Sequence, residues 1–413
     1  PEDADVLMVN TCAFIGPAKE ESIDAILDAA RAKAAGGPRR LVVTGCLAQR
    51  YADALVDELP EVDAFVGTGD LERIAEAVEG ETRAVYRGAQ HVLPRHALAP
   101  RVRTGAWWTA YLKVSEGCDH DCSFCIIPKI RGRHESRPLG DVVSEAAALA
   151  AEGTVELNLV AQDLTAYGRD LRDGTSLAVL LEALAIRVPA IRWIRLLYAY
   201  PTSVTDELLR VMADERAVCR YLDMPLQHAS EPVLARMRRP KGADAIRRLL
   251  ARIREAVPGI ALRSSFIVGF PGETDDDLRA LLDFLDAAEL DHVGVFRYSQ
   301  EEDTVAGGLP DQVDPGLIDE RWERVMAHQA AISARLAAAR VGRTVEVLVE
   351  ASDGDALVGR TSQQAPEIDG IITLRGAAAP GDLVRARVVR AGTYDLEGTI
   401  EAESPVDRCA ETP

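Results

Sequence analysis

Three cysteines lie within eight residues of one another and carry the clearest chemical signal in the sequence. They are Cys118, Cys122 and Cys125. Thiolates are soft ligands that suit iron–sulfur clusters or zinc, and three thiolates on a four-iron cluster leave one iron open to a substrate or cofactor. With a fourth ligand such as His120 or His134, the same cysteines would form a structural zinc site instead. The loop therefore predicts a metal centre of one of these two kinds.

The length and composition exclude several classes of protein. At 413 residues the chain is long enough for roughly three domains, which excludes a small disulfide-stapled scaffold. No apolar run approaches the ~20 residues that cross a bilayer, and the acidic start lacks the succession of a signal peptide. We therefore expect a cytoplasmic protein without membrane contact, whose seven cysteines stay reduced and are available as metal ligands.

The charge of the chain bears on its partners. The 47 basic and 66 acidic residues give a formal net charge of −19. A protein that follows a phosphate backbone usually shows a basic footprint, so this balance disfavours extended nucleic-acid contact. An acidic chain is better suited to a basic partner.

Residues 1–86 alternate short β-branched runs with amphipathic stretches, which predicts a parallel sheet covered by helices. Strands are expected at residues 6–9 and 41–44, with a right-handed helical crossover between them. Cys12 and Cys46 each follow one of these strands. Because the carboxyl ends of parallel strands meet at one edge of the sheet, we expect these two thiols to lie close together.

A second α/β domain is predicted at residues 105–340, after a linker at residues 87–104. Its six expected strands alternate with helical patterns, which predicts a full or partial βα barrel. Polar residues follow the strand ends, where barrels keep their chemistry. The expected strands are residues 110–114, 155–160, 193–198, 221–224, 261–268 and 292–298, and the polar rim includes Gln162, Asp163, Tyr200, Gln227, His228, Glu273 and residues 300–303.

Beyond a long helical stretch at residues 317–340, the hydrophobic period changes to two. Five short strands are expected within residues 341–405, which predicts a small antiparallel barrel of the oligonucleotide-binding type. Residues 406–413 are expected to form a tail. The sequence thus predicts an α/β multidomain protein with a C-terminal β-barrel.

The spacing of the cysteine loop, with Phe124 before its last thiol, resembles the signature of radical S-adenosylmethionine enzymes. The whole chain resembles one branch, the methylthiotransferases, which combine a flavodoxin-like N-terminal domain, a radical barrel and a C-terminal TRAM domain. The resemblance implies a [4Fe-4S] cluster on the three loop cysteines whose open iron binds S-adenosylmethionine. The cofactor then supplies the radical chemistry, and the protein positions the reactive carbon.

The same resemblance implies a second, auxiliary four-iron cluster on three N-terminal cysteines. Cys12 and Cys46 match two of those positions, and the third falls before Pro1. We expect it upstream in the natural chain, within one further βα unit of about 30 residues. One S-adenosylmethionine would then methylate a sulfur at the auxiliary cluster and another would yield the radical, so both clusters are expected to face one cavity. Flavodoxin or ferredoxin is the expected kind of electron donor.

Three segments resemble the branch that modifies the β-carbon of an aspartate in small-subunit ribosomal protein S-twelve. They are residues 160–168, 223–230 and 359–370. Residues 342–404 carry six arginines, no lysine and eleven carboxylates, a net charge of −5 that suits a basic ribosomal protein better than RNA. Against this, the basic segment 236–254 leaves a secondary RNA contact open.

Two alternatives remain open from the sequence. One is a methylthiotransferase that acts on a transfer RNA adenosine, and the other is a non-catalytic adaptor that holds zinc in the cysteine loop.

Weaker candidates for cofactor contacts are the rim residues and the aromatic residue of the loop. They are Phe124, Gln162, Asp163, Gly269 and Glu273.

Overall fold

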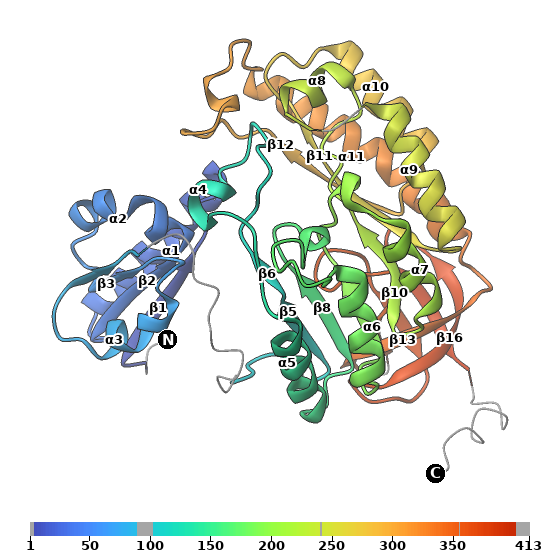
Figure 1. The fold of residues 1–413 in the computed structure, drawn as a ribbon, viewed down its shortest axis with the longest axis horizontal. Helices are drawn as coiled ribbons and strands as arrows, with labels where there is room; N and C mark the ends of the chain where they lie inside the picture. Colours follow the sequence, from blue (N-terminus) through green and yellow to red (C-terminus); the bar gives the residue numbers. More distant parts are fainter. Residues whose placement is uncertain (1–3, 89–101, 240–241, 355, 402–413) are drawn as a thin grey trace.

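The computed structural model describes residues 4–88, 102–239, 242–354 and 356–401, which form three consecutive units (Figure 1). Most of the predicted linker, the predicted tail and Cys409 lie outside these described residues. None of the helices within them combines the length and apolar character that a bilayer crossing needs.

The N-terminal unit is a four-stranded parallel sheet with strands in sequence order. Apolar side chains from the strands and helices pack between them, including Leu41, Val43, Leu47 and Phe65. The two strands expected from the sequence are confirmed, and two short ones were not anticipated. The elements are β1 (Val6–Thr11), α1 (Gly16–Ala34), β2 (Arg40–Gly45), α2 (Cys46–Glu58), β3 (Ala64–Val66), the 3₁₀ turn η1 (Leu71–Arg73), α3 (Ile74–Glu79) and β4 (Ala84–Tyr86).

The central unit is an open sheet of six parallel strands in the order β12-β11-β10-β9-β8-β5, which confirms a partial barrel. All six expected strands are present. They are β5 (Thr109–Lys113), β8 (Glu156–Val160), β9 (Trp193–Leu196), β10 (Val218–Asp223), β11 (Ala261–Val268) and β12 (His292–Arg297). The helices are α5 (Leu139–Ala151), α6 (Leu177–Arg187), α7 (Asp206–Asp214), α8 (Glu231–Arg236), α9 (Ala243–Ala256), α10 (Asp275–Ala288) and α11 (Pro315–Ala338), with η2 (Leu164–Ala166), η3 (Pro201–Ser203) and η4 (Ala306–Gly308).

Strand β5 shows how this sheet sorts its side chains. Ala110 and Leu112 are buried in the core with Val142 and Ala146 of α5. Because successive side chains of a strand point to opposite faces, Tyr111 and Lys113 lie on the inner face of the sheet. Their burial agrees, since Tyr111 is exposed and Lys113 half-buried. The inner face at this edge therefore carries polar groups.

The C-terminal unit is a closed five-stranded barrel, as expected. It departs from the predicted antiparallel pattern at one pair, because β15 and β17 run parallel. Its core includes Val347, Leu374 and Val388. The strands are β13 (Thr344–Asp353), β14 (Ala356–Thr361), β15 (Ile372–Arg375), β16 (Leu383–Ala391) and β17 (Leu396–Ile400).

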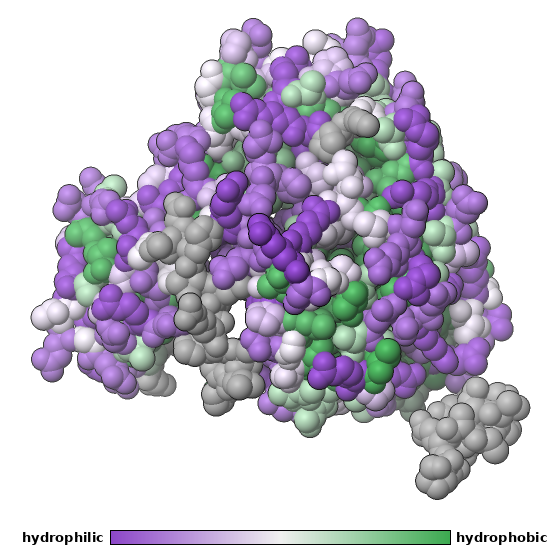
Figure 2. Space-filling view, viewed as in Figure 1, coloured by the Kyte–Doolittle hydropathy of each residue, from purple (hydrophilic) through white to green (hydrophobic). Residues whose placement is uncertain are grey.

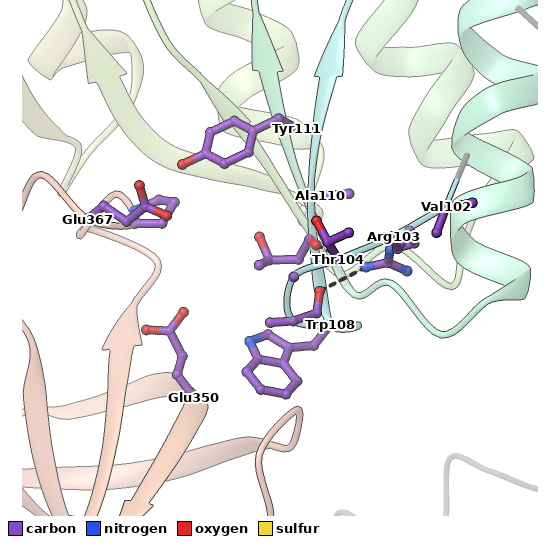
Figure 3. A pocket seen from close by; sticks show the side chains of 12 residues that line it. Val102, Arg103, Thr104, Trp108, Ala110, Tyr111, Glu350 and Glu367 are labelled. Carbon is purple, nitrogen blue, oxygen red and sulfur yellow. Dashed lines mark hydrogen bonds between the residues drawn. The ribbon is translucent and has the colours of Figure 1, made fainter. Parts of the chain in front are cut away.

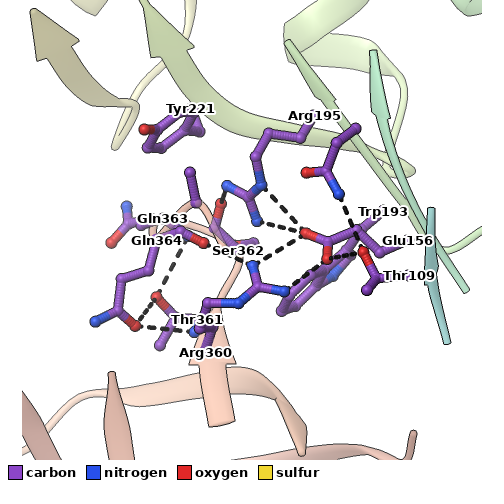
Figure 4. A network of polar contacts seen from close by, with 12 residues as sticks. Thr109, Glu156, Trp193, Arg195, Tyr221, Arg360, Thr361, Ser362, Gln363 and Gln364 are labelled. Atoms are coloured by element: carbon purple, nitrogen blue, oxygen red, sulfur yellow. Dashed lines mark hydrogen bonds and ion pairs between the residues drawn. The ribbon is translucent and has the colours of Figure 1, made fainter. Parts of the chain in front are cut away.

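A buried ion network joins this barrel to the inner face of the open sheet (Figure 4). The fully buried Glu156 of β8 lies 3.0 Å from Arg195 Nη2 and 2.7 Å from Arg360 Nη2 of β14. Burial opposes ionisation of Glu156, but the charge of Arg195 and the charge and hydrogen bonds of Arg360 outweigh it, so the pKa falls to about 2. Glu350 also binds Arg360, at 2.7 Å. The C-terminal barrel is thus fixed against the sheet by charge pairing as well as packing.

We expect Glu156→Gln to destabilise the folded protein by about 3–5 kcal/mol, because two guanidiniums would remain buried around a neutral group. Urea unfolding measures this. The pKa of Glu156 lies below its ordinary 4.5, so its stabilising contribution is present above that pH and is lost as the pH falls toward 2. The difference between wild-type and variant should shrink over that range. Glu350→Gln, whose side chain is 24% exposed, is the matched control and should cost less; equal losses would contradict this account.

Candidate active site

The ladder between β1 and β2 places Cys12 and Cys46 side by side. Its last pair is Thr11 with Gly45, so each cysteine is the next residue along its strand. Gly45 has a φ of +101°, and a Cβ there would lie 2.6 Å from the Thr11 carbonyl oxygen. Only glycine permits this close approach of the two strand ends. Cys46 is buried and Cys12 is exposed, so only the second of these two residues is open to solvent at the sheet edge.

The three loop cysteines lie beyond β6 (Ser115–Glu116), which pairs with β7 (Glu135–Ser136) and closes the base of the loop. Gly117 has a φ of +77°, and a Cβ on it would lie 2.0 Å from the Arg133 carbonyl oxygen. The Cys118 N–H donates to the Gly132 carbonyl at 3.0 Å. A local hairpin thus holds the loop at the carboxyl end of the open sheet.

The thiols of this loop are suited to metal ligation. Burial raises the pKa of Cys118 to about 11 and that of Cys125 to about 12, so neither ionises readily by itself. Arg239 Nη1 donates to the Cys122 sulfur at 3.7 Å. A metal centre that displaces the thiol protons would supply the missing positive charge. Among the described residues no group of three potential ligands is drawn together closely enough to hold a single metal ion.

The segment after Cys125 inserts into the N-terminal domain. Ile126 and Ile130, at and within α4 (Ile127–Arg131), are each 1% exposed and belong to the core cluster that includes Leu47 and Ala48 of α2. Figure 1 shows α4 between the N-terminal domain and the open sheet. The cysteine loop is therefore anchored on one side by the domain that carries Cys12 and Cys46.

Arg131 of α4 bridges the two groups of cysteines. Its Nη2 donates to the Cys46 sulfur at 3.4 Å, and its Nη1 lies 3.1 Å from a Glu116 carboxylate oxygen. Glu116 precedes Cys118 by two residues and also contacts Lys113 at the end of β5. One guanidinium therefore links the N-terminal thiols to the base of the loop, and the two cysteine groups border one region.

A stack of three side chains lies beside the loop. The His120 ring stacks on Tyr200 with centroids 3.5 Å apart, and the Arg239 guanidinium lies 4.2 Å from the Tyr200 centroid. His120 Nε2 is 2.7 Å from Asp163, which also accepts from Thr165. Despite burial, these two bonds lower the pKa of Asp163. His120, a possible fourth ligand for zinc, is thus bound to a carboxylate.

The other predicted cofactor contacts divide into two sets. Near the loop, Phe124 packs with Phe270 and Tyr298, and the buried Gln162 Oε1 has no donor among the described residues. A buried acceptor without a partner favours a ligand contact there. In the second set, which follows β11, the Gly269 N–H donates to Glu273 at 2.9 Å and Arg321 of α11 pairs with the same carboxylate at 3.1 Å. The structure therefore directs the Glu273 carboxylate into the protein.

His228 is fully buried next to this second set. Its Nδ1 accepts from the Ser230 N–H at 2.9 Å, and its Nε2 is 3.6 Å from a Glu273 oxygen. His134, the other possible ligand for zinc, has its Nε2 3.0 Å from the Ser136 hydroxyl. Each of these histidines therefore uses one ring nitrogen in a hydrogen bond within the fold.

The N-terminal domain is also held by the loop after β12. Glu301 lies 2.6 Å from Lys19 and 3.6 Å from Arg50, and its side chain is only 2% exposed. Ser299 in the same loop accepts a hydrogen bond from the Gly16 N–H at 3.1 Å. These contacts fix the domain that carries Cys12 and Cys46 relative to the open sheet.

Sequence reasoning missed the cations and the buried carboxylate that connect these parts. Glu301 lay within the predicted polar rim and Arg239 within the basic segment 236–254, neither with an assigned role at the cysteines, and Arg131 and Lys113 were not singled out. A usable signal was present for Lys113, because a charged residue in an otherwise apolar strand usually faces a site. Arg131 and Arg239 carry no such local signal, since their partners are distant in the sequence.

A pocket of about 500 Å³ lies elsewhere, between β5 and the C-terminal barrel (Figure 3). Tyr111, Trp108, Glu350 and Glu367 line it together with residues 102–106. None of the cysteines that the structure describes lines it. The chemistry of the cysteine loop is therefore separate from this pocket.

Family models match all three units. The Radical SAM superfamily matches residues 112–285, the TRAM domain matches residues 341–400, and the model described as Uncharacterized protein family UPF0004 matches residues 1–67. Together with the open sheet and its three-cysteine loop, these matches define a radical S-adenosylmethionine enzyme with an added thiol-bearing domain and a TRAM barrel.

The chain belongs to the RimO family of methylthiotransferases. It is 50% identical to the "Ribosomal protein uS12 methylthiotransferase RimO" of Anaeromyxobacter sp. (strain K), over 98% of this chain and 87% of that protein. It is 49% identical to the protein of the same name from Desulforudis audaxviator, over 98% of this chain and 90% of the relative. Membership of this enzyme family excludes the non-catalytic zinc adaptor.

Solved structures share the fold. The radical S-adenosylmethionine methyltransferase TsrM from Kitasatospora setae, solved with cobalamin and a [4Fe-4S] cluster, superposes with a TM-score of 0.53 at 17% identity, covering 74% of this chain and 63% of that one. A TsrM structure with tryptophan and a SAM analogue gives the same TM-score over 80% of this chain and 78% of that one.

We expect Glu301→Ala to loosen the N-terminal domain from the sheet, because Lys19 and Arg50 would lose a buried carboxylate, at a cost of about 1–3 kcal/mol. Hydrogen–deuterium exchange should become faster in α1 and α2 while the strands of the open sheet stay protected. Gln300→Ala is the matched control in the same loop, because its exposed side chain donates to the Gly307 carbonyl oxygen of that loop. The same change in exchange for both variants would count against the role of Glu301.

Proposed function

We propose that this enzyme attaches a methylthio group to the β-carbon of an aspartate in ribosomal protein uS12. The observation that carries the proposal is the arrangement around Arg131, which borders the N-terminal thiols on one side and the base of the three-cysteine loop on the other. A reaction that forms a carbon–sulfur bond needs the sulfur source and the radical source at one place. The name of the relatives supports uS12 as the substrate.

The residues that would hold the cofactors follow from this arrangement. Cys118, Cys122 and Cys125 would hold a [4Fe-4S] cluster with S-adenosylmethionine on its open iron, and Cys12 and Cys46 would hold a second, auxiliary cluster. When bound, these groups supply a radical able to remove hydrogen from a carbon and a sulfur able to bond to that carbon. Phe124, Gln162 and Asp163 remain our candidates for S-adenosylmethionine contacts, together with Gly269 and Glu273.

The chain's own side chains have three tasks in this proposal. Arg131 and Arg239 each donate a hydrogen bond to a proposed ligand sulfur, Cys46 and Cys122 respectively, and so hold these sulfurs in place. The stack of His120, Tyr200 and Arg239 gives one wall of the site a fixed shape. Glu301 and α4 hold the two halves in register, so that the reacting atoms meet in a fixed geometry.

The charge of the surface supports a protein substrate. Residues 342–404 carry the net charge of −5, which suits a basic ribosomal protein. The face shown in Figure 2 is mainly hydrophilic, with apolar residues in small separate groups. In the basic segment, Arg252 and Arg254 donate to the backbone of Val204 and Ala288, so part of its charge is engaged within the fold. RNA contact is therefore a secondary proposal.

The reaction's setting follows from the proposed substrate. A ribosomal protein places the activity in the cytoplasm, and a small redox protein such as flavodoxin or ferredoxin would supply the electron.

We expect Cys122→Ala to abolish the release of 5′-deoxyadenosine from S-adenosylmethionine after anaerobic reconstitution with iron, sulfide and dithionite, because the cluster would lose one of its three ligands. Liquid chromatography measures the product, and bound iron should fall in parallel. Cys219→Ala is the matched control, because Cys219 is 3% exposed in an apolar cluster. Undiminished release by the Cys122 variant would contradict the assignment of the loop.

We expect uS12, and not transfer RNA, to gain a methylthio group when this enzyme is expressed in cells that lack their own methylthiotransferases for uS12 and for transfer RNA. Mass spectrometry of the digested ribosomal protein locates the added group, and the aspartate should carry it on the β-carbon. Analysis of transfer RNA nucleosides from the same cells is the parallel measurement. A methylthio group on adenosine with none on uS12 would overturn the proposed substrate.

A further inference from the structure

The carboxyl end of β5 carries a lysine that shares its carboxylate partner with an arginine. Lys113 is the last residue of β5, and its side chain is 35% exposed on the inner face of the sheet. It contacts the carboxylate of Glu116, whose side chain is 10% exposed. Arg131 binds the same carboxylate at 3.1 Å and 3.3 Å. Two cations therefore share one carboxylate next to Cys46.

The neighbouring cations have other partners. Arg137 pairs with Glu145 at 2.7 Å and donates to the Lys113 carbonyl oxygen, and Arg50 is engaged with Glu301. Within the described residues, Glu116 is the one carboxylate paired with either Lys113 or Arg131. The group formed by Lys113, Arg131 and Glu116 thus keeps a net positive charge at the border between the two cysteine sites.

The surroundings of Lys113 favour an incoming anion. Burial, followed by the charges of Arg131 and Arg137, lowers the pKa of Lys113 to about 8, while Cys46 opposes the shift. A carboxylate placed against the ammonium would relieve this repulsion. Lys113 has donors to spare, because its ammonium carries three N–H groups and one of them bonds to Glu116. The two terminal nitrogens of Arg131 already lie against Glu116 and Cys46, which fixes the direction of its remaining N–H groups.

We propose that Lys113 binds the side-chain carboxylate of the substrate aspartate and so holds the adjacent β-carbon beside Cys46. This inference rests on the proposed function, because the β-carbon of an aspartate is bonded directly to its carboxylate carbon. Fixing the carboxylate therefore fixes the carbon that receives sulfur. Lys113 also becomes a determinant of specificity, since the adenine of a transfer RNA offers no carboxylate to this ammonium.

The test is a binding cycle with the reconstituted full chain, without reductant so that no turnover occurs. Labelled uS12 and a uS12 variant with asparagine at the modified aspartate are titrated against wild-type enzyme and Lys113→Met, with fluorescence anisotropy as the readout. We expect Lys113→Met to weaken binding of the aspartate form about tenfold and to leave the asparagine form nearly unchanged. Wild-type enzyme should prefer the aspartate form by about the same factor.

Two further variants keep the result interpretable. Lys113→Arg retains the charge and should retain much of the preference for aspartate. Lys33→Met removes the same charge at the opposite end of the N-terminal sheet, where Lys33 pairs with Asp63, and should leave binding of both forms unchanged. Should Lys113→Met prove unfolded in thermal unfolding, the wild-type preference and the Lys113→Arg variant still decide the question.

The outcomes separate this inference from the proposed function. If wild-type enzyme modifies uS12 but binds its aspartate and asparagine forms equally, or if Lys113→Met weakens both forms alike, the role of Lys113 is overturned while the proposed function stands. If wild-type enzyme modifies transfer RNA and leaves uS12 unmodified, the proposed function fails and this inference fails with it.

Discussion

The contact of Arg131 with both Cys46 and Glu116 is the constraint on which the arrangement of the site depends. Cys46 belongs to the N-terminal sheet and Glu116 to the base of the three-cysteine loop, so the two meet only if the domains are held together at this point. The apolar side chains of Ile126 and Ile130 supply that packing from the same short segment. Local chain geometry thus brings a thiol of one domain to the metal loop of another.

Two buried carboxylates likewise hold the other units in place through ion pairs. Glu301 holds the N-terminal domain through Lys19 and Arg50, and Glu156 holds the C-terminal barrel through Arg195 and Arg360. Each is nearly inaccessible to water, so each charge requires its partners. The three units are therefore held at fixed positions around the open sheet, which keeps the two groups of cysteines in a constant relation to each other.

Much of the fold followed from local pattern. The alternation of strand and helix predicted the six strands of the open sheet, and the rule for parallel strand ends predicted that Cys12 and Cys46 would be neighbours, which the β1–β2 register bears out. The cysteine loop was equally evident because its chemistry lies in residues close together in sequence. The parallel pairing of β15 with β17 was not evident, because strand patterns do not fix which strands close a barrel.

The contacts that assemble the site could not be predicted in the same way. Arg131 meets Cys46 across 85 positions of sequence, and Lys19 meets Glu301 across 282. The hydrophobic periodicity of the sequence does not predict such pairings, because they form only when separately folded units pack together. The rim residue Glu273 is a second example: its position after a barrel strand predicts a cofactor contact, but the sequence gives no sign that its carboxylate also binds the Gly269 N–H and Arg321.

The most direct test of the account is an anaerobic crystal structure of the enzyme loaded with iron, sulfide and S-adenosylmethionine. The account predicts a four-iron cluster on Cys118, Cys122 and Cys125, with S-adenosylmethionine on the side of the loop that faces Arg131 and Cys46. A single zinc ion in the loop, or S-adenosylmethionine bound on the side away from Cys46, would contradict it.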